Sequence, residues 1–325
     1  MTNESYKKII DLISDLARKK ILEACCRKIR WEDLDPEPIR KLIGLALDED
    51  LTGSGLIAKP ELKGDRSSAL LGSDQHIQTT LQAREPLCLS GLPLAYEILN
   101  CFDERLEFKK SAEDGEWISP GKPIATISGP CQSVLTIERT LLNFLQRLSG
   151  IATTTRRFSD RLGDSRTRLL DTRKTTPGYR YLEKYSVARG GGWNHRMGLF
   201  DRVMLKDNHL AAFGNDLRAA TRQAARLSRK ENPGLLIEME VDRLDQIDAA
   251  LEGAVDIILL DNFTLPDLQK AQALIGDQAV TEISGNVSLD TIADYRALGC
   301  DFISTGALVH KSVWVDIGLD WDCAL

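Results

Sequence analysis

The chain has 325 residues, enough for two domains or for one barrel with a smaller unit beside it. Hydrophobic residues make up 42% and charged residues 28%, and the formal net charge of −6 argues against a general nucleic-acid-binding surface. The N-terminus lacks the apolar core of a secretory signal, and apolar runs such as "IILL" at 257–260 are too short to cross a bilayer. Seven cysteines without a C-x-x-C pair predict reduced thiols in the cytoplasm, not a disulfide framework or a zinc site.

The first half of the chain shows three successive sequence patterns. Residues 1–30 place apolar side chains at helical spacing, which predicts a helix packed on the body of the protein or on a partner, and "IRKLIGLALDED" resumes that pattern after "WEDLDPEPIR" interrupts it. Between 52 and 130, glycine and proline are frequent, and alternating runs such as "HIQTTLQAR" and "KPIATISG" predict short antiparallel strands. Residues 136–150 predict an amphipathic helix that ends at Gly150.

Beyond residue 165, short apolar runs alternate with helical patterns such as those at 216–230 and 265–276. This alternation predicts repeated strand-helix units on a parallel sheet, in the α/β class. Periodicity alone does not distinguish an open doubly wound sheet from a barrel. The predicted strands are 168–171, 202–206, 235–241, 255–261, 279–284 and 300–305.

Charged and small polar residues follow these predicted strands. Ligands gather at the carboxyl ends of parallel strands, so these residues are candidates for a binding site. The alternative is a closed network of ion pairs, with no ligand, among Asp171, Lys206, Glu240 and Asp261. The residues at the six strand ends are Asp171 with Arg173 and Lys174, Lys206, Glu238 with Glu240, Asp261, Ser284-Gly285-Asn286, and Ser304-Thr305-Gly306.

Two features bear on the ligand. Small residues let backbone N–H groups approach an anion closely, so "SGN" and "STGA" are candidate phosphate-binding turns. Three consecutive glycines at 190–192 precede His195 and Arg196, and such a loop either closes over a ligand or is a mobile surface loop. The standard motifs of P-loop nucleotidases, dinucleotide dehydrogenases, zincins and serine hydrolases are absent from the sequence.

Several blocks of this sequence resemble the quinolinate phosphoribosyltransferase family, also called carboxylating nicotinate-nucleotide pyrophosphorylases. The main block is "DTRKTTPGYRYLEKYSVARGGGWNHRMGLFDRVMLKDNHL", and "IERTLLNFLQRLSGIATTT", "IEMEV", "IILLDNF", "EISGNVSLDTI" and "DFISTGALVH" match in the same order. The likeness runs from about 36 to 320. Residues 1–35 have no counterpart in it, and "LDEDLTGSGLIAK" lacks the family's Gly-Asp-x-Thr, which puts the site entrance or a subunit interface in question.

The resemblance implies an N-terminal α/β sandwich over 1–139 beside an incomplete TIM-like α/β barrel over 140–310. Residues 1–35 would then be a helical extension, and 311–325 would return to the first domain. The implied reaction joins quinolinate to phosphoribosyl pyrophosphate and gives nicotinate mononucleotide, pyrophosphate and CO2 in NAD biosynthesis, with Mg²⁺ accompanying the pyrophosphate. The family forms homodimers or larger assemblies in which an arginine, here Arg139, enters the neighbouring subunit's site.

The resemblance also implies roles for individual residues. The carboxylates of quinolinate are expected to meet Arg139, Arg173, Lys174, His195 and Arg196, and Thr172 is expected among the substrate-binding residues. Lys174 and Lys206 are expected where the two substrates meet, and Glu240 and Asp261 near the ribose hydroxyls and, indirectly or through substrate, the metal. These four residues are the expected catalytic set, and no nucleophile is assigned. The phosphate-binding turns are expected at Ser284, Gly285 and Asn286 and at Thr305, Gly306 and Ala307.

The residue types suit such ligands, because two anions can share one site only if cations surround them, and arginine meets a carboxylate with two parallel hydrogen bonds. Three alternatives stay open. One is a relative of this family from molybdenum-transport operons with another acceptor. The others are a Schiff-base lyase that uses Lys206 as its amine and a non-catalytic binder of phosphorylated metabolites.

Overall fold

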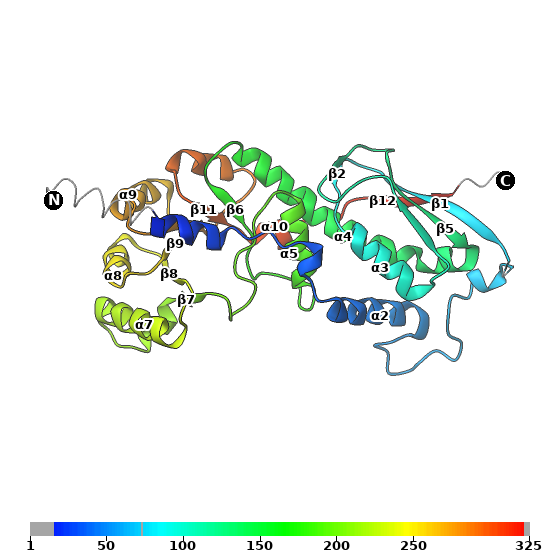
Figure 1. The fold of residues 1–325 in the computed structure, drawn as a ribbon, viewed down its shortest axis with the longest axis horizontal. Coiled ribbons are helices and arrows are strands. Elements are labelled where there is room, and N and C mark those ends of the chain that lie inside the picture. The colour runs from blue at the N-terminus through cyan, green and yellow to red at the C-terminus, as the bar shows by residue number, and fades with distance from the viewer. Residues whose placement is uncertain (1–15, 73, 322–325) are drawn as a thin grey trace. The chain divides into compact units, whose positions relative to one another are not determined.

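The computed structural model describes residues 16–72 and 74–321, and the chain forms two compact units (Figure 1). The barrel unit takes in residues up to 28, 157–175 and 192–310, and the sandwich unit takes in 29–156, 176–191 and 311 onward. The predicted division has boundaries at 139/140 and 310/311, whereas the units interleave further, because residues up to 28 belong to the barrel unit and 140–156 and 176–191 to the sandwich unit. The interleaving arises because α4 (Cys131–Leu162) runs from one unit into the other and because the end of the chain returns to the sandwich unit.

The sandwich unit is built on a four-stranded antiparallel sheet in the order β12-β1-β5-β3. Thr79 in β1 pairs with Ile127 on one side and Trp321 on the other, so the last described strand completes this sheet. Helices α2, α3 and α4 contribute buried aliphatic side chains to one core with β1 and β5, among them Ile43, Leu81, Ile98, Ile127 and Leu141. The strands of this unit are β1 (His76–Ala83), β2 (Leu87–Cys88), β3 (Glu107–Lys110), β4 (Trp117–Ile118), β5 (Pro123–Pro130) and β12 (Ile317–Trp321).

The helices of the sandwich unit correct two predictions from the sequence. The segment 52–130 contains the expected strands β1 and β5, but it also contains helix α3 (Leu92–Phe102), whose buried residues recur at helical spacing. Helix α4 does not end at Gly150 but continues to Leu162. A Cβ atom at Gly150 would lie 2.2 Å from the Val313 carbonyl oxygen, so this glycine permits close backbone packing instead of ending the helix. The other helices are α2 (Pro36–Thr52), α5 (Arg180–Arg189), η1 (Trp31–Asp33) and η2 (Ser68–Leu70).

The barrel unit holds a six-stranded parallel sheet in the order β6-β11-β10-β9-β8-β7. The first and last strands of this unit are paired with each other, and the order has its two edges at β6 and β7, which are consecutive in the chain. That cyclic order is an incomplete barrel and not a doubly wound sheet. The strands, close to their predicted positions, are β6 (Arg168–Leu170), β7 (Val203–Leu205), β8 (Ile237–Val241), β9 (Ile257–Asp261), β10 (Val280–Ser284) and β11 (Phe302–Ser304).

Helices separate most of these strands, and Figure 1 shows α7, α8 and α9 following one another beside them. Between β10 and β11 a 3₁₀ segment replaces the α-helix. Within the described residues, no helix combines the length and apolar character that crossing a bilayer requires. The helical elements of this unit are α6 (Asp207–Ala211), α7 (Leu217–Glu231), η3 (Leu244–Gln246), α8 (Ile247–Glu252), α9 (Leu265–Ile275), η4 (Ile292–Leu298) and α10 (Ala307–His310).

The N-terminal extension belongs to the barrel unit over its described part. Residues 16–25 are helical, and Cys25 lies in a buried cluster with Leu170, Ile257 and Phe302 of the strands. Arg18 anchors the helix through an ion pair of 2.7 Å to Asp301. The predicted packing of an N-terminal helix on the body is therefore confirmed for 16–25, and residues 1–15 of that prediction lie outside the described residues.

Candidate active site

The carboxyl ends of the six parallel strands open on one cavity of about 400 Å³. Residues that lie far apart in the chain share it because parallel strands present the same edge of the sheet. Its walls carry the predicted cations from three loops and the predicted carboxylates from two strands. The lining residues are Thr172, Arg173, Lys174, His195, Arg196, Met204, Lys206, Glu240, Leu259, Asp261, Glu282, Ser284 and Ser304.

Asp171, at the end of β6, fixes the loop that bears His195. Its side chain is fully buried, and its Oδ1 accepts a hydrogen bond of 2.8 Å from the His195 backbone N–H. Its Oδ2 accepts another of 2.8 Å from the side-chain amide of Asn194. The loop after the three glycines is thus tied to the sheet, and His195 is only 5% exposed, so the mobile-loop alternative is wrong for this residue.

The imidazole of His195 faces two buried carboxylates. Its Nε2 lies 3.4 Å from Glu238 Oε2 and 3.3 Å from Glu282 Oε1. Burial by itself lowers the pKa of His195, but Glu282 and Glu238 outweigh it and raise the pKa to about 9. The Arg196 N–H donates to Nδ1 at 2.7 Å, which favours a neutral ring. The carboxylates outweigh burial because they carry full charges where water is excluded, and they face the Nε2 side of the ring.

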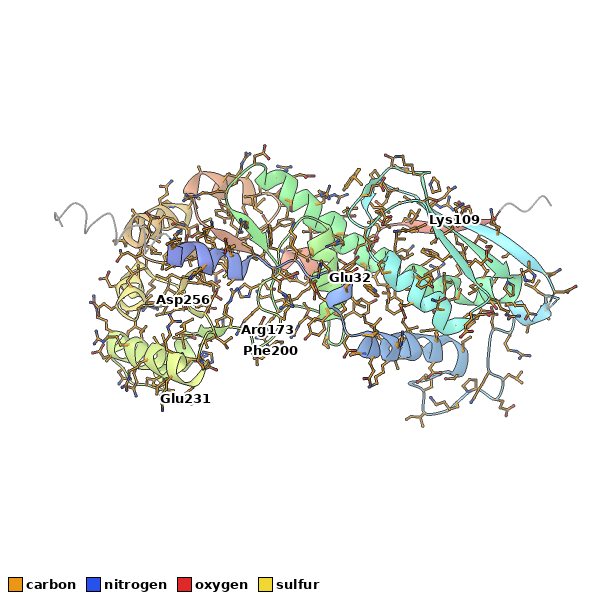
Figure 2. All side chains as sticks on the ribbon, in the orientation of Figure 1. Glu32, Lys109, Arg173, Phe200, Glu231 and Asp256 are labelled. Atoms are coloured by element: carbon orange, nitrogen blue, oxygen red, sulfur yellow. The ribbon has the colours of Figure 1, made fainter. Side chains whose placement is uncertain are left out.

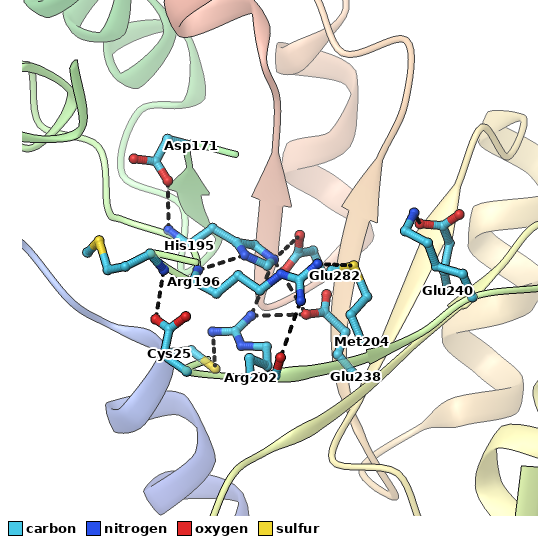
Figure 3. A network of polar contacts seen from close by, with 12 residues as sticks. Cys25, Asp171, His195, Arg196, Arg202, Met204, Glu238, Glu240 and Glu282 are labelled. Carbon is cyan, nitrogen blue, oxygen red and sulfur yellow. Dashed lines mark hydrogen bonds and ion pairs between the residues drawn. The ribbon is translucent and has the colours of Figure 1, made fainter. Parts of the chain in front are cut away.

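Arg202 supplies a second buried cation behind the histidine (Figure 3). Its Nη1 donates to Glu238 Oε2 at 3.1 Å, and its Nη2 lies 3.4 Å from Cys25 Sγ. Burial disfavours a charged Glu238, yet His195 and Arg202 lower its pKa to about 2. A metal ion could bind side chains of the kinds found at His195, Glu238 and Glu282. The Arg202 guanidinium, however, already provides the cation that these carboxylates need.

Two arginines point their charge at the cavity. The pKa of Arg196 lies below its usual value because of burial and then because of repulsion by Arg173. Arg196 is held by its own contacts, since Nη1 donates to the Arg202 carbonyl at 3.2 Å and Nη2 lies 3.3 Å from Met204 Sδ. The Nε of Arg173 is buried and has no hydrogen-bond partner within the described part of the chain. Because the two guanidinium groups carry like charges close together, they are suited to bind one anion that contacts both.

Lys206 and two carboxylates line the other side of the cavity. The Lys206 ammonium is paired with Glu240 at the end of β8. Asp261 ends β9, and burial, followed by repulsion from Glu240, raises its pKa. Lys206 and Glu240 thus form an ion pair of the expected network, and the hydrogen bonds of Asp171 given above hold the His195 loop.

The turn after β10 needs its glycine. Gly285 has φ +82°, and a Cβ there would lie 2.2 Å from Asn262 Oδ1 and 2.8 Å from the Asn262 backbone N. Asn286 follows at φ 53°, also left-handed, and its side-chain amide donates to Asn262 Oδ1 at 3.0 Å. The turns after β9 and β10 therefore interlock next to Asp261 and Ser284.

The turn after β11 is equally tight. A Cβ at Gly306 would lie 2.8 Å from Lys174 Cδ, so only glycine leaves the lysine side chain its place. Thr305 is buried, and its hydroxyl donates to the Val287 carbonyl at 3.1 Å and accepts from the Ala307 N–H at 3.2 Å. Gly285, Asn286, Thr305, Gly306 and Ala307 thus form the turns beside the cavity without lining it.

Most predicted residues of the barrel unit meet at this cavity, and a few that matter were missed. Glu282 interrupts the apolar strand "VTEIS" with a charge, a signal that could have identified it. Met204, Leu259 and Arg202 carry no such signal, because apolar strand residues and single arginines are common everywhere. Arg139 lies exposed on α4 in the sandwich unit, and its role remains a prediction.

The chain is similar to known proteins over most of its length. Family models described as quinolinate phosphoribosyl transferase match its residues 65–149 (N-terminal domain) and 151–320 (C-terminal domain). A "Probable nicotinate-nucleotide pyrophosphorylase [carboxylating]" from Bacillus subtilis is 35% identical over 79% of this chain and 88% of its own length. A protein of Mycobacterium leprae named "Nicotinate-nucleotide pyrophosphorylase [carboxylating]" is 37% identical over 89% of this chain and 99% of its own.

A solved structure is also similar to this chain. NadC from Streptococcus pyogenes aligns with a TM-score of 0.80 and 37% identity, over 89% of this chain and 99% of its own. The incomplete barrel and its companion unit are therefore the architecture of these enzymes. The comparisons do not support the molybdenum-operon, Schiff-base and binder alternatives.

Proposed function

The chain belongs to the quinolinate phosphoribosyltransferase family, and from that premise we propose that its cavity joins quinolinate to phosphoribosyl pyrophosphate. The products are nicotinate mononucleotide, pyrophosphate and CO2, which makes the chain a pentosyltransferase of NAD biosynthesis. The observation that carries the proposal is the single cavity of about 400 Å³ where two arginines, two lysines, a buried histidine and two accessible carboxylates meet. Such a charge pattern suits two anionic substrates held side by side.

We assign the dicarboxylate to the loops after β6 and before β7. Arg173 and Arg196 are like charges kept close together, and His195 beside them carries further positive charge. A planar dicarboxylate can accept from both guanidinium groups, which relieves their repulsion and pairs the buried Nε of Arg173. Lys174, across the Gly306 turn, lies where the dicarboxylate and the phosphoribosyl group would meet.

The phosphoribosyl half is assigned to Lys206, Glu240, Asp261 and the two turns. As pyrophosphate leaves, positive charge develops at the anomeric carbon of the ribose, and Glu240 and Asp261 stabilise that charge or orient the hydroxyls. The turns at 284–286 and 305–307 offer backbone N–H groups to phosphate oxygens. After the transfer, the carboxylate next to the ring nitrogen leaves as CO2, the positive pyridinium nitrogen stabilises the electron pair left on that carbon, and a proton from water then binds there, so no covalent enzyme intermediate is required.

The residues beside Glu240 fit the expected Mg²⁺. A second cavity, of about 640 Å³, adjoins the first at Glu240 and Asp261 and also bears Asp207 and Asp242. Magnesium prefers carboxylate oxygens together with substrate phosphates, and a cation here offsets the repulsion that raises the pKa of Asp261 together with burial. Glu240 and Asp261 would hold the ion indirectly or through substrate, and its charge would neutralise the pyrophosphate as it forms.

The family resemblance supports two further parts of the proposal. We propose a homodimer or a larger homo-oligomer in which Arg139 of one subunit enters the neighbour's site, which agrees with its exposed position on α4. We also propose a cytoplasmic location, supported by the six described cysteines, none of which forms a disulfide within the described residues.

One assay tests the function. Consumption of quinolinate should require both phosphoribosyl pyrophosphate and Mg²⁺, should stop on addition of EDTA and should resume with excess Mg²⁺. Nicotinate is the control acceptor and should give no product. Product from nicotinate, with quinolinate untouched, would assign the chain to another acceptor.

A further inference from the structure

Arg202 touches the substrate-binding residues from behind without lining the cavity. It is 5% exposed, and its Nη1 lies 3.3 Å from His195 Nε2 as well as 3.1 Å from Glu238 Oε2. Its backbone carbonyl accepts from Arg196 Nη1 at 3.2 Å. One buried residue thus contacts both side chains that are assigned to the dicarboxylate from the 195–196 loop.

The position of Arg202 answers an electrostatic need. Glu238 and Glu282 are fully buried, and Glu238 Oε1 and both oxygens of Glu282 accept no hydrogen bond within the described residues. Buried carboxylates must be matched by cations. Without Arg202 they would face His195 alone and draw it, or Arg196, away from the cavity. Arg202 therefore shares the charge of these carboxylates with His195 and leaves the Arg196 charge available to a ligand.

The N-terminal extension closes the same region from the other side. Cys25 Sγ lies 3.4 Å from Arg202 Nη2, and the Arg27 carbonyl accepts from the Asn194 N–H at 2.8 Å in a β-bridge next to His195. Lys28 Nζ lies 4.5 Å from the centre of the Trp193 ring. Residues 25–28 precede the ranges that the family models match, which begin at residue 65.

We propose that Arg202 and residues 25–28 form a rear wall of the active site, which positions His195 and Arg196 for a dicarboxylate. Arg202 is a positioning residue in this scheme, because it acts through His195, Glu238 and Arg196. The inference rests on the proposed function for the identity of the dicarboxylate. It gives the N-terminal extension a role in substrate affinity.

The test is Arg202→Met in the full-length chain, with Arg202→Lys and Arg229→Met beside it. Arg202→Met should raise the KM for quinolinate at least about tenfold, the loss expected for a displaced charge-assisted contact, while the KM for phosphoribosyl pyrophosphate changes little. Arg202→Lys should raise the KM for quinolinate less than Arg202→Met does, since lysine keeps the charge but lacks the branched donor of arginine. Arg229→Met removes an ion pair of 2.7 Å to Asp256, labelled in Figure 2, and should behave as wild type.

Two further variants, one of Cys25 and one that combines Arg202 with Glu238, complete the test. Cys25→Ala removes the weak sulfur acceptor without adding volume at this buried position, so it should raise the KM for quinolinate by a smaller factor than Arg202→Met does. If Arg202→Met does not fold, Arg202→Met with Glu238→Gln removes both charges of the pair, and this double variant should fold and still bind quinolinate weakly in equilibrium dialysis.

The outcomes separate the two claims. A folded Arg202→Met protein, or the double variant, with wild-type affinity for quinolinate would overturn the rear wall while leaving the function intact. A wild-type chain that consumes no quinolinate would overturn the function first. A selective rise in the KM for quinolinate, graded from Lys to Met, supports the rear wall, because general damage would change both KM values and the turnover number together.

Discussion

Replacing Gly285 with alanine tests whether the interlocked turns after β9 and β10 shape the phosphate end of the site. Alanine at φ +82° costs about 1–2 kcal/mol for the left-handed backbone alone. Its Cβ would also lie 2.8 Å from the Asn262 backbone N, and an overpacked contact of this kind costs about 1–3 kcal/mol more. We therefore expect Gly285→Ala to lose about 2–5 kcal/mol of unfolding free energy.

The control is Gly234→Ala, because Gly234 has φ +88° and nothing within 4 Å of its Cβ position. It precedes β8 at the amino end of the strands, opposite the cavity, and should lose only the backbone cost of about 1–2 kcal/mol. Urea unfolding measures both losses. Since Asn262 follows Asp261, its displacement should also raise the KM for phosphoribosyl pyrophosphate at least about tenfold, or about 1.4 kcal/mol, in Gly285→Ala only. Equal stabilities and equal KM values in the two variants would refute this account of the turn.

Three further predictions concern the charges of the site. Arg173→Ala should weaken quinolinate binding at least about tenfold in equilibrium dialysis while the melting temperature stays near wild type, and unchanged binding would remove Arg173 from the site. Arg139→Ala protein mixed with Lys206→Ala protein should regain activity if subunits share sites, and verified mixed dimers without activity would argue against sharing. Burial lowers the pKa of His195, but Glu282 and Glu238 raise it to about 9. The charged ring therefore contributes to the free energy of unfolding, and this contribution is fully present below a pH of about 6.5. That contribution is lost as the pH rises through about 9, so unfolding free energy and quinolinate affinity should both fall over this range, and His195→Gln should show a flatter profile in each measurement.

The local patterns of the sequence predicted the elements that carry the site. The strands β6 to β11 lie within one or two residues of the predicted runs, because a buried parallel strand is a short apolar stretch that ends at its first polar residue. Helix α3 was missed although its apolar residues recur at helical spacing, because the glycines and prolines around it signalled turns. The end of α4 was misplaced because glycine ends many helices, and the sequence does not show that Gly150 faces the backbone of residue 313.

The side chains at the strand ends, and with them the cationic and acidic character of the site, follow from the sequence pattern. The pairing of β6 with β11 follows only from the folded chain, and it closes the strands into an incomplete barrel and brings Arg173 to the same cavity as Lys206 and Asp261. The same holds for the buried contacts of Arg202, whose partners Cys25 and Glu238 lie 177 and 36 residues away in the chain. The reason is physical: periodicity reports the burial of one face over a few residues, whereas a buried charge is neutralised by whichever distant element the fold brings beside it.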